Sequence, residues 1–110
     1  MKDEATREVL VKARELVEKG WTKGAMARNK YRHRVQFDSL CAVKFCAIGA
    51  ISRSAKDRPS DQEKLDISAR KAIRKINELD SISVFNDSDD TTKADVLAAF
   101  DKAIAYASEQ

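Results

Sequence analysis

Apolar side chains recur every three or four residues over the first 18 positions of the chain, and charged side chains fill most positions between them. The apolar set consists of Ala5, Val9, Ala13, Leu16 and Val17. Because an α-helix turns once in 3.6 residues, this spacing puts the set on one face and predicts an amphipathic helix of about four turns. Gly20 follows where many helices end in a left-handed conformation, so we expect the helix to stop there.

The periodicity changes between residues 21 and 39, where apolar or aromatic side chains alternate with polar ones. The alternating side chains are Tyr31, His33, Val35 and Phe37. A period of two is typical of a β-strand. We therefore predict a short two-stranded hairpin that turns near Asn29 and Lys30.

The segment from Cys41 to Lys56 is apolar on almost every side, which predicts a helix in the middle of the bundle. Gly49 interrupts the run, although glycine lowers helix stability relative to alanine. We therefore expect another backbone or a large ring to pass close to Gly49. If Cys41 and Cys46 share this helix, their directions differ by about 140°, so we expect neither a disulfide nor a joint metal site.

Two further amphipathic stripes predict a third and a fourth helix in the second half of the chain. Ser60 with Glu63 has the spacing of a capping box before the third helix, and Thr92 with Asp95 has it before the fourth. The third stripe consists of Leu65, Ala69, Ala72, Ile73, Ile76 and Leu79. The fourth consists of Val96, Leu97, Phe100, Ala103, Ile104 and Ala107. Residues 80–90 between the stripes are expected to form a loop.

These elements predict a single, mainly α domain over residues 1–110, a compact four-helix domain with a short β-hairpin between helices 1 and 2. Apolar residues make up 43% of the chain and charged residues 35%, a balance typical of folded proteins. The N-terminal residues lack the apolar stretch of a secretory signal, and the longest apolar run, residues 40–51, is too short to cross a bilayer. We therefore expect a cytoplasmic protein that does not bind membranes.

Three segments of the chain carry recognisable motifs. They are Gly20–Arg28 (GWTKGAMAR), Phe45–Ile51 (FCAIGAI) and Val84–Asp87 (VFND), the last followed by Thr92–Leu97 (TKADVL). Their order and spacing resemble a family of small bacterial and phage proteins of unknown function with W-x-x-G-A-x-A-R, C-x-x-G-A and W-N-D motifs. Phe85 stands where that family usually has Trp. The resemblance implies a microbial or phage protein in one domain and carries no activity over to this chain.

Chemically reactive side chains are few. His33 is the only histidine in the chain, and a buried Cys46 is expected to behave as a small hydrophobe rather than a nucleophile. Side-chain hydrogen bonds from Asn86 and Asp87 are expected to hold their own loop. We predict no catalytic residues, no metal site and no cofactor. The alternative to core packing is a ligand pocket or minor active site, with a reactive cysteine, formed by Trp21, Cys46, Phe85 and Asp87.

Positive charge is concentrated in the middle of the chain. Residues 19–58 contain 10 basic and 2 acidic side chains, whereas residues 1–18 carry a net charge of −1 and residues 59–110 carry −4. Cations mixed with aromatic rings suit phosphates and bases, and they suit an acidic protein surface equally well. The candidate partner-binding residues are Lys23, Arg28, Lys30, Tyr31, Arg32 and Arg34. The alternative is that these charges are only solvated.

We therefore predict a non-enzymatic interaction module that binds a macromolecular partner, foremost an acidic protein surface, through residues 21–37. With the phage origin that the resemblance allows, inhibition of a host factor is a natural role. The alternative is a nucleic-acid-binding protein that uses the same basic patch. The opposed charges of the middle and C-terminal segments permit self-association without requiring it, so the oligomeric state stays open.

Overall fold

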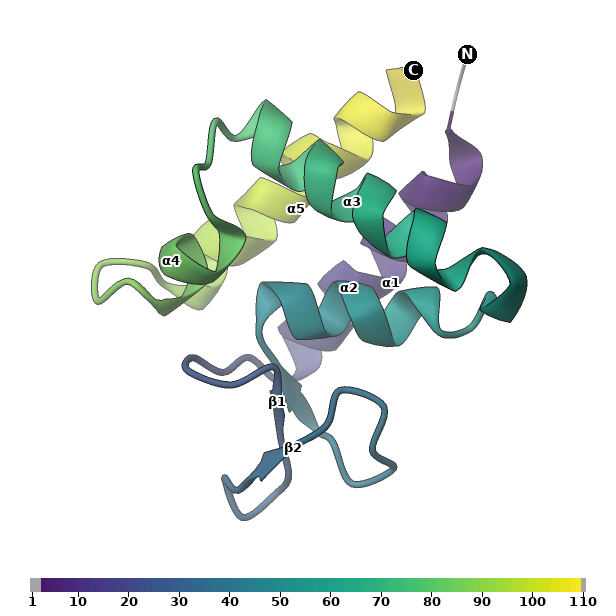
Figure 1. Cartoon of the computed structure of the whole chain (residues 1–110). Helices are drawn as coiled ribbons and strands as arrows, with labels where there is room; N and C mark the ends of the chain where they lie inside the picture. The colour runs from purple at the N-terminus through teal and green to yellow at the C-terminus, as the bar shows by residue number, and fades with distance from the viewer. Residues whose placement is uncertain (1–2, 110) are drawn as a thin grey trace.

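The computed structural model describes residues 3–109, and within them the chain forms helices and a small antiparallel sheet. The helices are α1 (Glu4–Lys19), α2 (Ala47–Ala55), a 3-10 turn η1 (Pro59–Asp61), α3 (Gln62–Ile76), α4 (Ile82–Asp87) and α5 (Lys93–Glu109). The strands are β1 (Ala27–Arg28), β2 (Arg34–Val35) and β3 (Lys44–Phe45). Figure 1 shows the helices gathered into one body, from which the strands and their loops project at one end. The prediction of a mainly helical fold is confirmed.

α1 begins and ends where the sequence predicts, but the conformation of Gly20 after its last turn differs from the prediction. Asp3 caps the N-terminus by accepting a hydrogen bond from the backbone N–H of Thr6 at 3.1 Å. The buried face of the helix is formed by Thr6, Val9, Leu10, Ala13 and Val17. Gly20 is extended, with a φ of −168°, so the expected left-handed conformation is wrong. A Cβ at Gly20 would lie 2.3 Å from the carbonyl oxygen of Val43, and close packing therefore explains this glycine.

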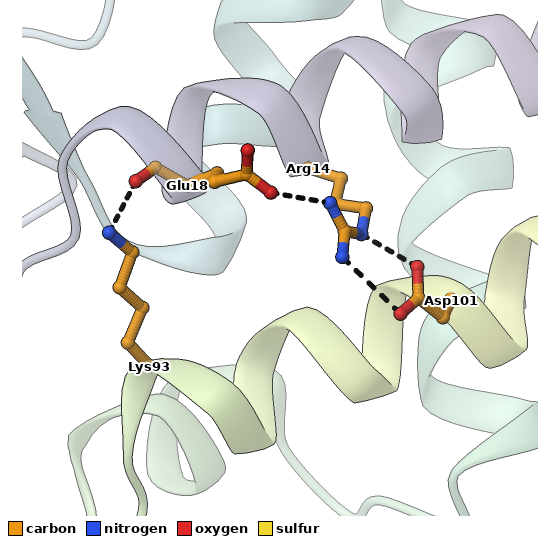
Figure 2. Close-up of polar contacts among 4 residues, drawn as sticks. All are labelled: Arg14, Glu18, Lys93 and Asp101. Carbon is orange, nitrogen blue, oxygen red and sulfur yellow. Dashed lines mark hydrogen bonds and ion pairs between the residues drawn. The ribbon is translucent and has the colours of Figure 1, made fainter.

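A polar network joins α1 to α5 outside the core (Figure 2). Arg14 donates from Nε and Nη2 to the two carboxylate oxygens of Asp101, at 2.6 and 3.4 Å, and from Nη1 to Glu18 at 2.8 Å. The hydrogen bonds to Asp101 and then to Glu18 raise the pKa of Arg14 above its ordinary value. Lys93 donates to the backbone carbonyl of Glu18 near the end of α1. These contacts fix the start of α5 against the last turns of α1.

α2 is shorter than the apolar run predicted. Of its nine residues the buried ones are Ala47, Gly49, Ala50, Ile51, Ser52, Ser54 and Ala55, in keeping with a helix covered by α1 and α3. The predicted start at Cys41 is wrong, because Lys44 and Phe45 pair with β1 as strand β3. Cys41 is exposed and Cys46 is buried, and both thiols are free. The helical geometry assumed for the two cysteines therefore does not apply.

The close approach expected at Gly49 is present. A Cβ built there would lie 1.9 Å from the carbonyl oxygen of Met26. The same carbonyl accepts a hydrogen bond from the N–H of Cys46 at 3.1 Å. The absence of a side chain at Gly49 thus lets α2 begin directly against the segment that leads into β1.

The sheet has the order β2-β1-β3, with β1 in the centre. Ala27 pairs with Val35 on one side and with Phe45 on the other. The chain reverses between β1 and β2 close to the predicted turn, at residues 29–33. The strands are shorter than the alternation predicts, and β3 was not predicted because its residues lie in the apolar run that resembled a helix.

The second half of the chain contains one more helix than expected. The predicted capping box of Ser60 and Glu63 is wrong: residues 59–61 form a 3-10 turn, and Asp61 makes no side-chain cap before α3. The second capping box is confirmed, since Thr92 N–H donates to Asp95 at 2.9 Å and Asp95 N–H donates to Thr92 Oγ1 at 3.2 Å. Part of the loop predicted at 80–90 is the short helix α4.

Candidate functional site

The turn between β1 and β2 is internally hydrogen-bonded. We call residues 29–34 the basic tip. Asn29 Oδ1 accepts from the N–H groups of Tyr31 at 2.9 Å and His33 at 3.0 Å, and the N–H of Asn29 donates to the carbonyl of His33 at 3.0 Å. An asparagine that bonds the backbone two and four residues later stabilises a turn locally. The basic tip is therefore held in one conformation before any partner arrives.

Arg32 adopts a left-handed backbone conformation, with a φ of 69°. Glycine adopts this conformation without a steric cost, whereas for a residue with a Cβ the conformation is less favourable by about 1 kcal/mol. The backbone still needs the conformation, because the N–H of Arg32 donates to the carbonyl of Asn29 at 3.0 Å. An arginine thus occupies the position at which glycine would be most stable.

The outward side chains of the basic tip combine cations with aromatic rings. Tyr31 is 67% exposed, the Nζ of Lys30 lies 5.0 Å from its ring centroid, and the His33 ring lies 6.3 Å away, tilted by 41°. Lys30, Arg32 and Arg34 are exposed, and within residues 3–109 no carboxylate forms an ion pair with them. The tip therefore presents three uncompensated positive charges.

Two of the six predicted partner-binding residues are engaged inside the protein. Arg28 donates to Thr22 Oγ1 at 2.9 Å and to the carbonyls of Arg32 at 2.9 Å and Lys23 at 3.2 Å. Lys23 donates to the carbonyl of Ser88 at 2.6 Å and lies over the ring of Trp21 at 5.3 Å. Arg28 and Lys23 therefore brace the loops behind the tip, and the free charge belongs to the other three cations.

The second predicted group surrounds a buried amide, Asn86, which is 1% exposed. Its Oδ1 accepts from Trp21 Nε1 at 2.8 Å and from the N–H of Ala47 at 3.0 Å. Its Nδ2 donates to the carbonyl of Thr22 at 3.1 Å and to Asp87 Oδ1 at 2.9 Å. We call this arrangement the Asn86 latch. A side-chain amide has two N–H donors and two acceptor lone pairs. The four hydrogen bonds of the latch therefore use the full hydrogen-bonding capacity of Asn86.

The latch joins the segments that carry the three sequence motifs. Asp87 Oδ1 also accepts from the N–H of Gly24 at 3.0 Å, and Phe85 packs partly buried against the core. The expectation that Asn86 and Asp87 bond to backbone groups is right, but most of their partners lie more than 35 residues away rather than in their own loop. Burial of an asparagine between distant segments leaves no periodic signal in the sequence, so the latch could not be predicted.

Cys46 serves as the N-terminal cap of α2. It is 8% exposed, and its Sγ accepts from the N–H of Gly49 at 3.2 Å. Burial is the main cause that raises the pKa of the Cys46 thiol, which lowers the thiolate fraction that a nucleophile needs. Within residues 3–109 no three His, Cys, Asp or Glu side chains are grouped to hold a metal ion, and no helix is long and apolar enough to cross a membrane.

These features define a small, mainly helical domain in which a buried asparagine of α4 joins the segment that follows α1 to the first turn of α2. The chain belongs to a family of unknown function, DUF6197, whose model matches residues 1–106. The prediction of a family of unknown function is thus confirmed. No curated protein and no solved structure matches the chain.

Proposed function

We propose that this protein is a non-enzymatic interaction module whose basic tip binds an acidic surface of a partner protein. The observation that carries the proposal is the set of three exposed cations, Lys30, Arg32 and Arg34, on a hydrogen-bonded turn, with which no carboxylate of residues 3–109 forms an ion pair. Charge of one sign on an ordered surface speeds the encounter with an oppositely charged partner and selects its orientation. With a phage origin, the acidic partner would be a host protein.

The backbone of Arg32 supports the same proposal. Strained conformations persist where the surrounding structure holds them, and they concentrate at sites of function. Glycine at position 32 would relieve the strain but would remove one of the three charges. The presence of arginine with a φ of 69° is therefore explained if its guanidinium contacts a partner.

Tyr31 is the proposed anchor of the interface. Its ring is mostly exposed and lies close to both Lys30 and His33. Tyrosine is enriched among residues that contribute most to binding, because it buries a large area with little loss of side-chain entropy. Contact with a partner is thus proposed for Lys30, Tyr31, Arg32 and Arg34, with Lys23 and Arg28 in a supporting role.

The test compares two doubly charge-reversed variants. A photoreactive phenylalanine at position 31 first captures partners from a microbial lysate, and the affinity of each partner is then measured by calorimetry. Lys30→Glu with Arg34→Glu is expected to weaken binding at least about tenfold. Lys64→Glu with Lys102→Glu makes the same change in net charge at exposed helical positions and is expected to leave the affinity unchanged. Equal affinities for the two variants would contradict the proposal.

Nucleic acid is the second candidate partner, favoured by the neighbouring rings of Tyr31 and His33, which could stack on exposed bases. Fluorescence anisotropy with labelled single- and double-stranded DNA and RNA at several salt concentrations tests it. Affinity that falls linearly with the logarithm of salt concentration, and that Tyr31→Ala weakens, would assign the tip to nucleic acid. No binding at low salt would remove this candidate.

A further inference from the structure

A groove of about 340 Å³ lies where α2, α3 and α4 meet, apart from the basic tip. In Figure 1 these three helices lie above the strands, which carry the tip at the opposite end of the view. Each helix contributes one isoleucine to the groove: Ile48 from α2, Ile67 from α3 and Ile82 from α4. Small-molecule sites usually enclose about 300–1,000 Å³, so the groove is large enough for a small ligand.

Ile67 is 47% exposed and lies on the outer face of α3. The core face of this helix is formed by Leu65, Ala69, Ala72 and Ile73, so Ile67 contributes little to the core. An isolated exposed aliphatic residue needs no explanation. Here, however, Ile67 borders a concave surface that also contains Ile48 and the largely buried Ile82, which gives the groove an apolar floor.

The rim of the groove is positively charged. Arg70, Lys71 and Arg74 follow Ile67 by three, four and seven residues, which places them on the same face of α3. Arg70 is held by Asp66 at 2.7 Å and by Ser52 Oγ at 3.0 Å. For Lys71 and Arg74, by contrast, the part of the chain described, residues 3–109, supplies no side-chain hydrogen bond or ion pair.

Among the described residues that line the groove, Asp80 is the only one with a carboxylate. It opposes the two free cations, Lys71 and Arg74, so the lining keeps an excess of positive charge. The guanidinium of Arg74 offers a planar pair of donors that matches the two oxygens of a carboxylate. Lys71 adds a mobile point charge on the same side.

We propose that this groove binds a small aliphatic carboxylate. The aliphatic part would cover Ile48, Ile67 and Ile82, and the carboxylate would pair with Arg74 and Lys71. Burial of the aliphatic part stabilises the complex in proportion to the apolar area removed from water, and the pairing of charges selects anions over neutral molecules. This site is independent of the proposed function, because no residue of the basic tip takes part.

Ligands with the same alkyl chain and different head groups separate the contribution of apolar burial from the contribution of charge pairing. Hexanoate, hexan-1-ol and hexylammonium are titrated into the ¹⁵N-labelled protein, and amide chemical shifts are followed by NMR. Hexanoate is expected to shift the amides of Ile48, Ile82 and residues 67–74, to bind at least about fivefold more tightly than hexan-1-ol, and to weaken with added salt. Hexylammonium is expected to leave these amides unshifted.

A charge swap provides the decisive variant. Lys71→Glu with Arg74→Glu is expected to abolish hexanoate binding and to give the groove a preference for hexylammonium, while Lys102→Glu serves as the exposed control. Ile67→Ser is expected to weaken hexanoate and hexan-1-ol alike. Equal shifts with hexanoate and hexylammonium, or hexanoate shifts confined to residues 29–34, would overturn the proposal. Unchanged hexanoate binding in the charge-swapped variant would overturn it as well.

Discussion

At the scale of single residues, polar side chains that the sequence offered as a candidate ligand pocket or active site form internal hydrogen bonds instead. Trp21, Cys46 and Asp87 each contribute a polar atom to an internal hydrogen bond. A buried polar group without a partner costs free energy, which explains the contacts of the half-buried Trp21 and the buried Cys46, whereas Asp87 is exposed. The motif residues are thus explained by stability, whereas the exposed residues of the basic tip have no such structural role.

The Asn86 latch leads to a prediction about stability. Asn86→Ala is expected to lower the free energy of unfolding by about 3 kcal/mol, since it leaves the buried groups of Trp21, Thr22 and Ala47 without their partner. Asn86→Asp, which replaces the donor to Thr22 and Asp87 with a carboxylate oxygen, is expected to cost at least as much, because it buries a negative charge beside Asp87. Urea denaturation followed by circular dichroism measures both. Ser83→Ala, at an exposed position of the same helix, serves as the control, and an equally small cost for all three variants would contradict the role of the latch.

Cys46 is expected to be unreactive in the folded protein. In Cys41→Ser, which leaves one thiol, a disulfide reagent such as Ellman's is expected to react only after unfolding, whereas Cys46→Ser is expected to react at once through Cys41. Rapid labelling of native Cys41→Ser would support a reactive centre instead.

The same thiol also gives stability a pH dependence. Because burial raises the folded-state pKa of Cys46, its contribution is complete below the unfolded pKa of about 8.5. That contribution decreases as the pH rises from there through the folded-state pKa. Unfolding measured between pH 7 and 10 is expected to lose part of this dependence in Cys46→Ala, and an identical pH profile in that variant would contradict the assignment.

At the scale of secondary structure, left-handed backbone conformations occur at the end of α3 and in the hairpin turn. α3 ends with Glu78 in the left-handed region at a φ of 54°, while the N–H of Leu79 donates to the carbonyl of Arg74 at 2.9 Å. This is the pattern in which helices usually have glycine. Arg32 occupies the corresponding left-handed position in the hairpin. The two residues carry similar backbone strain, but only Arg32 belongs to the proposed interface.

A pair of glycine variants separates strain from binding. Arg32→Gly and Glu78→Gly are each expected to raise stability by up to about 1 kcal/mol, which corresponds to about 4 °C in the melting temperature. Arg32→Gly is also expected to weaken partner binding, whereas Glu78→Gly is expected to leave it unchanged. Differential scanning calorimetry and the partner titration provide the two readouts. A glycine at position 32 that stabilises the protein without any loss of affinity would argue against contact between Arg32 and a partner.

At the scale of the whole molecule, the fold separates two positively charged surfaces. The basic tip extends from the strand end (Figure 1), and the groove is lined by residues of α2, α3, α4 and the segment before α4. The two ends of the described chain meet elsewhere, where the N–H of Asp3 donates to the carbonyl of Ala107 at 3.3 Å. A large partner at the tip and a small ligand in the groove would therefore not compete for the same residues.

Local periodicity predicted the long helices well, because an amphipathic pattern in α1, α3 and α5 reports which face is buried regardless of what covers it. The same reasoning failed at Cys41–Cys46, since a short apolar run fits a strand and a helix equally well. It failed again at α4, whose six residues are too few to form a stable helix alone. Burial of Ile82 and Asn86 by the rest of the chain supplies what the local sequence lacks.

The sequence by itself determined the helical class, the reversal of the chain near Asn29, the confirmed cap at Thr92 and the excess of positive charge in its middle. These depend on residues close together in the chain. Only the tertiary structure decided that Lys23 and Arg28 are internal braces, that Asn86 joins three motifs, and that Ile67 shares a groove with Ile48 and Ile82. The hydrogen bonds of Arg28 span only four to six residues. The other features join residues far apart in the chain, such as Trp21 with Asn86 and Lys23 with Ser88, each pair 65 positions apart, and such contacts are set by how the whole chain packs rather than by any local pattern.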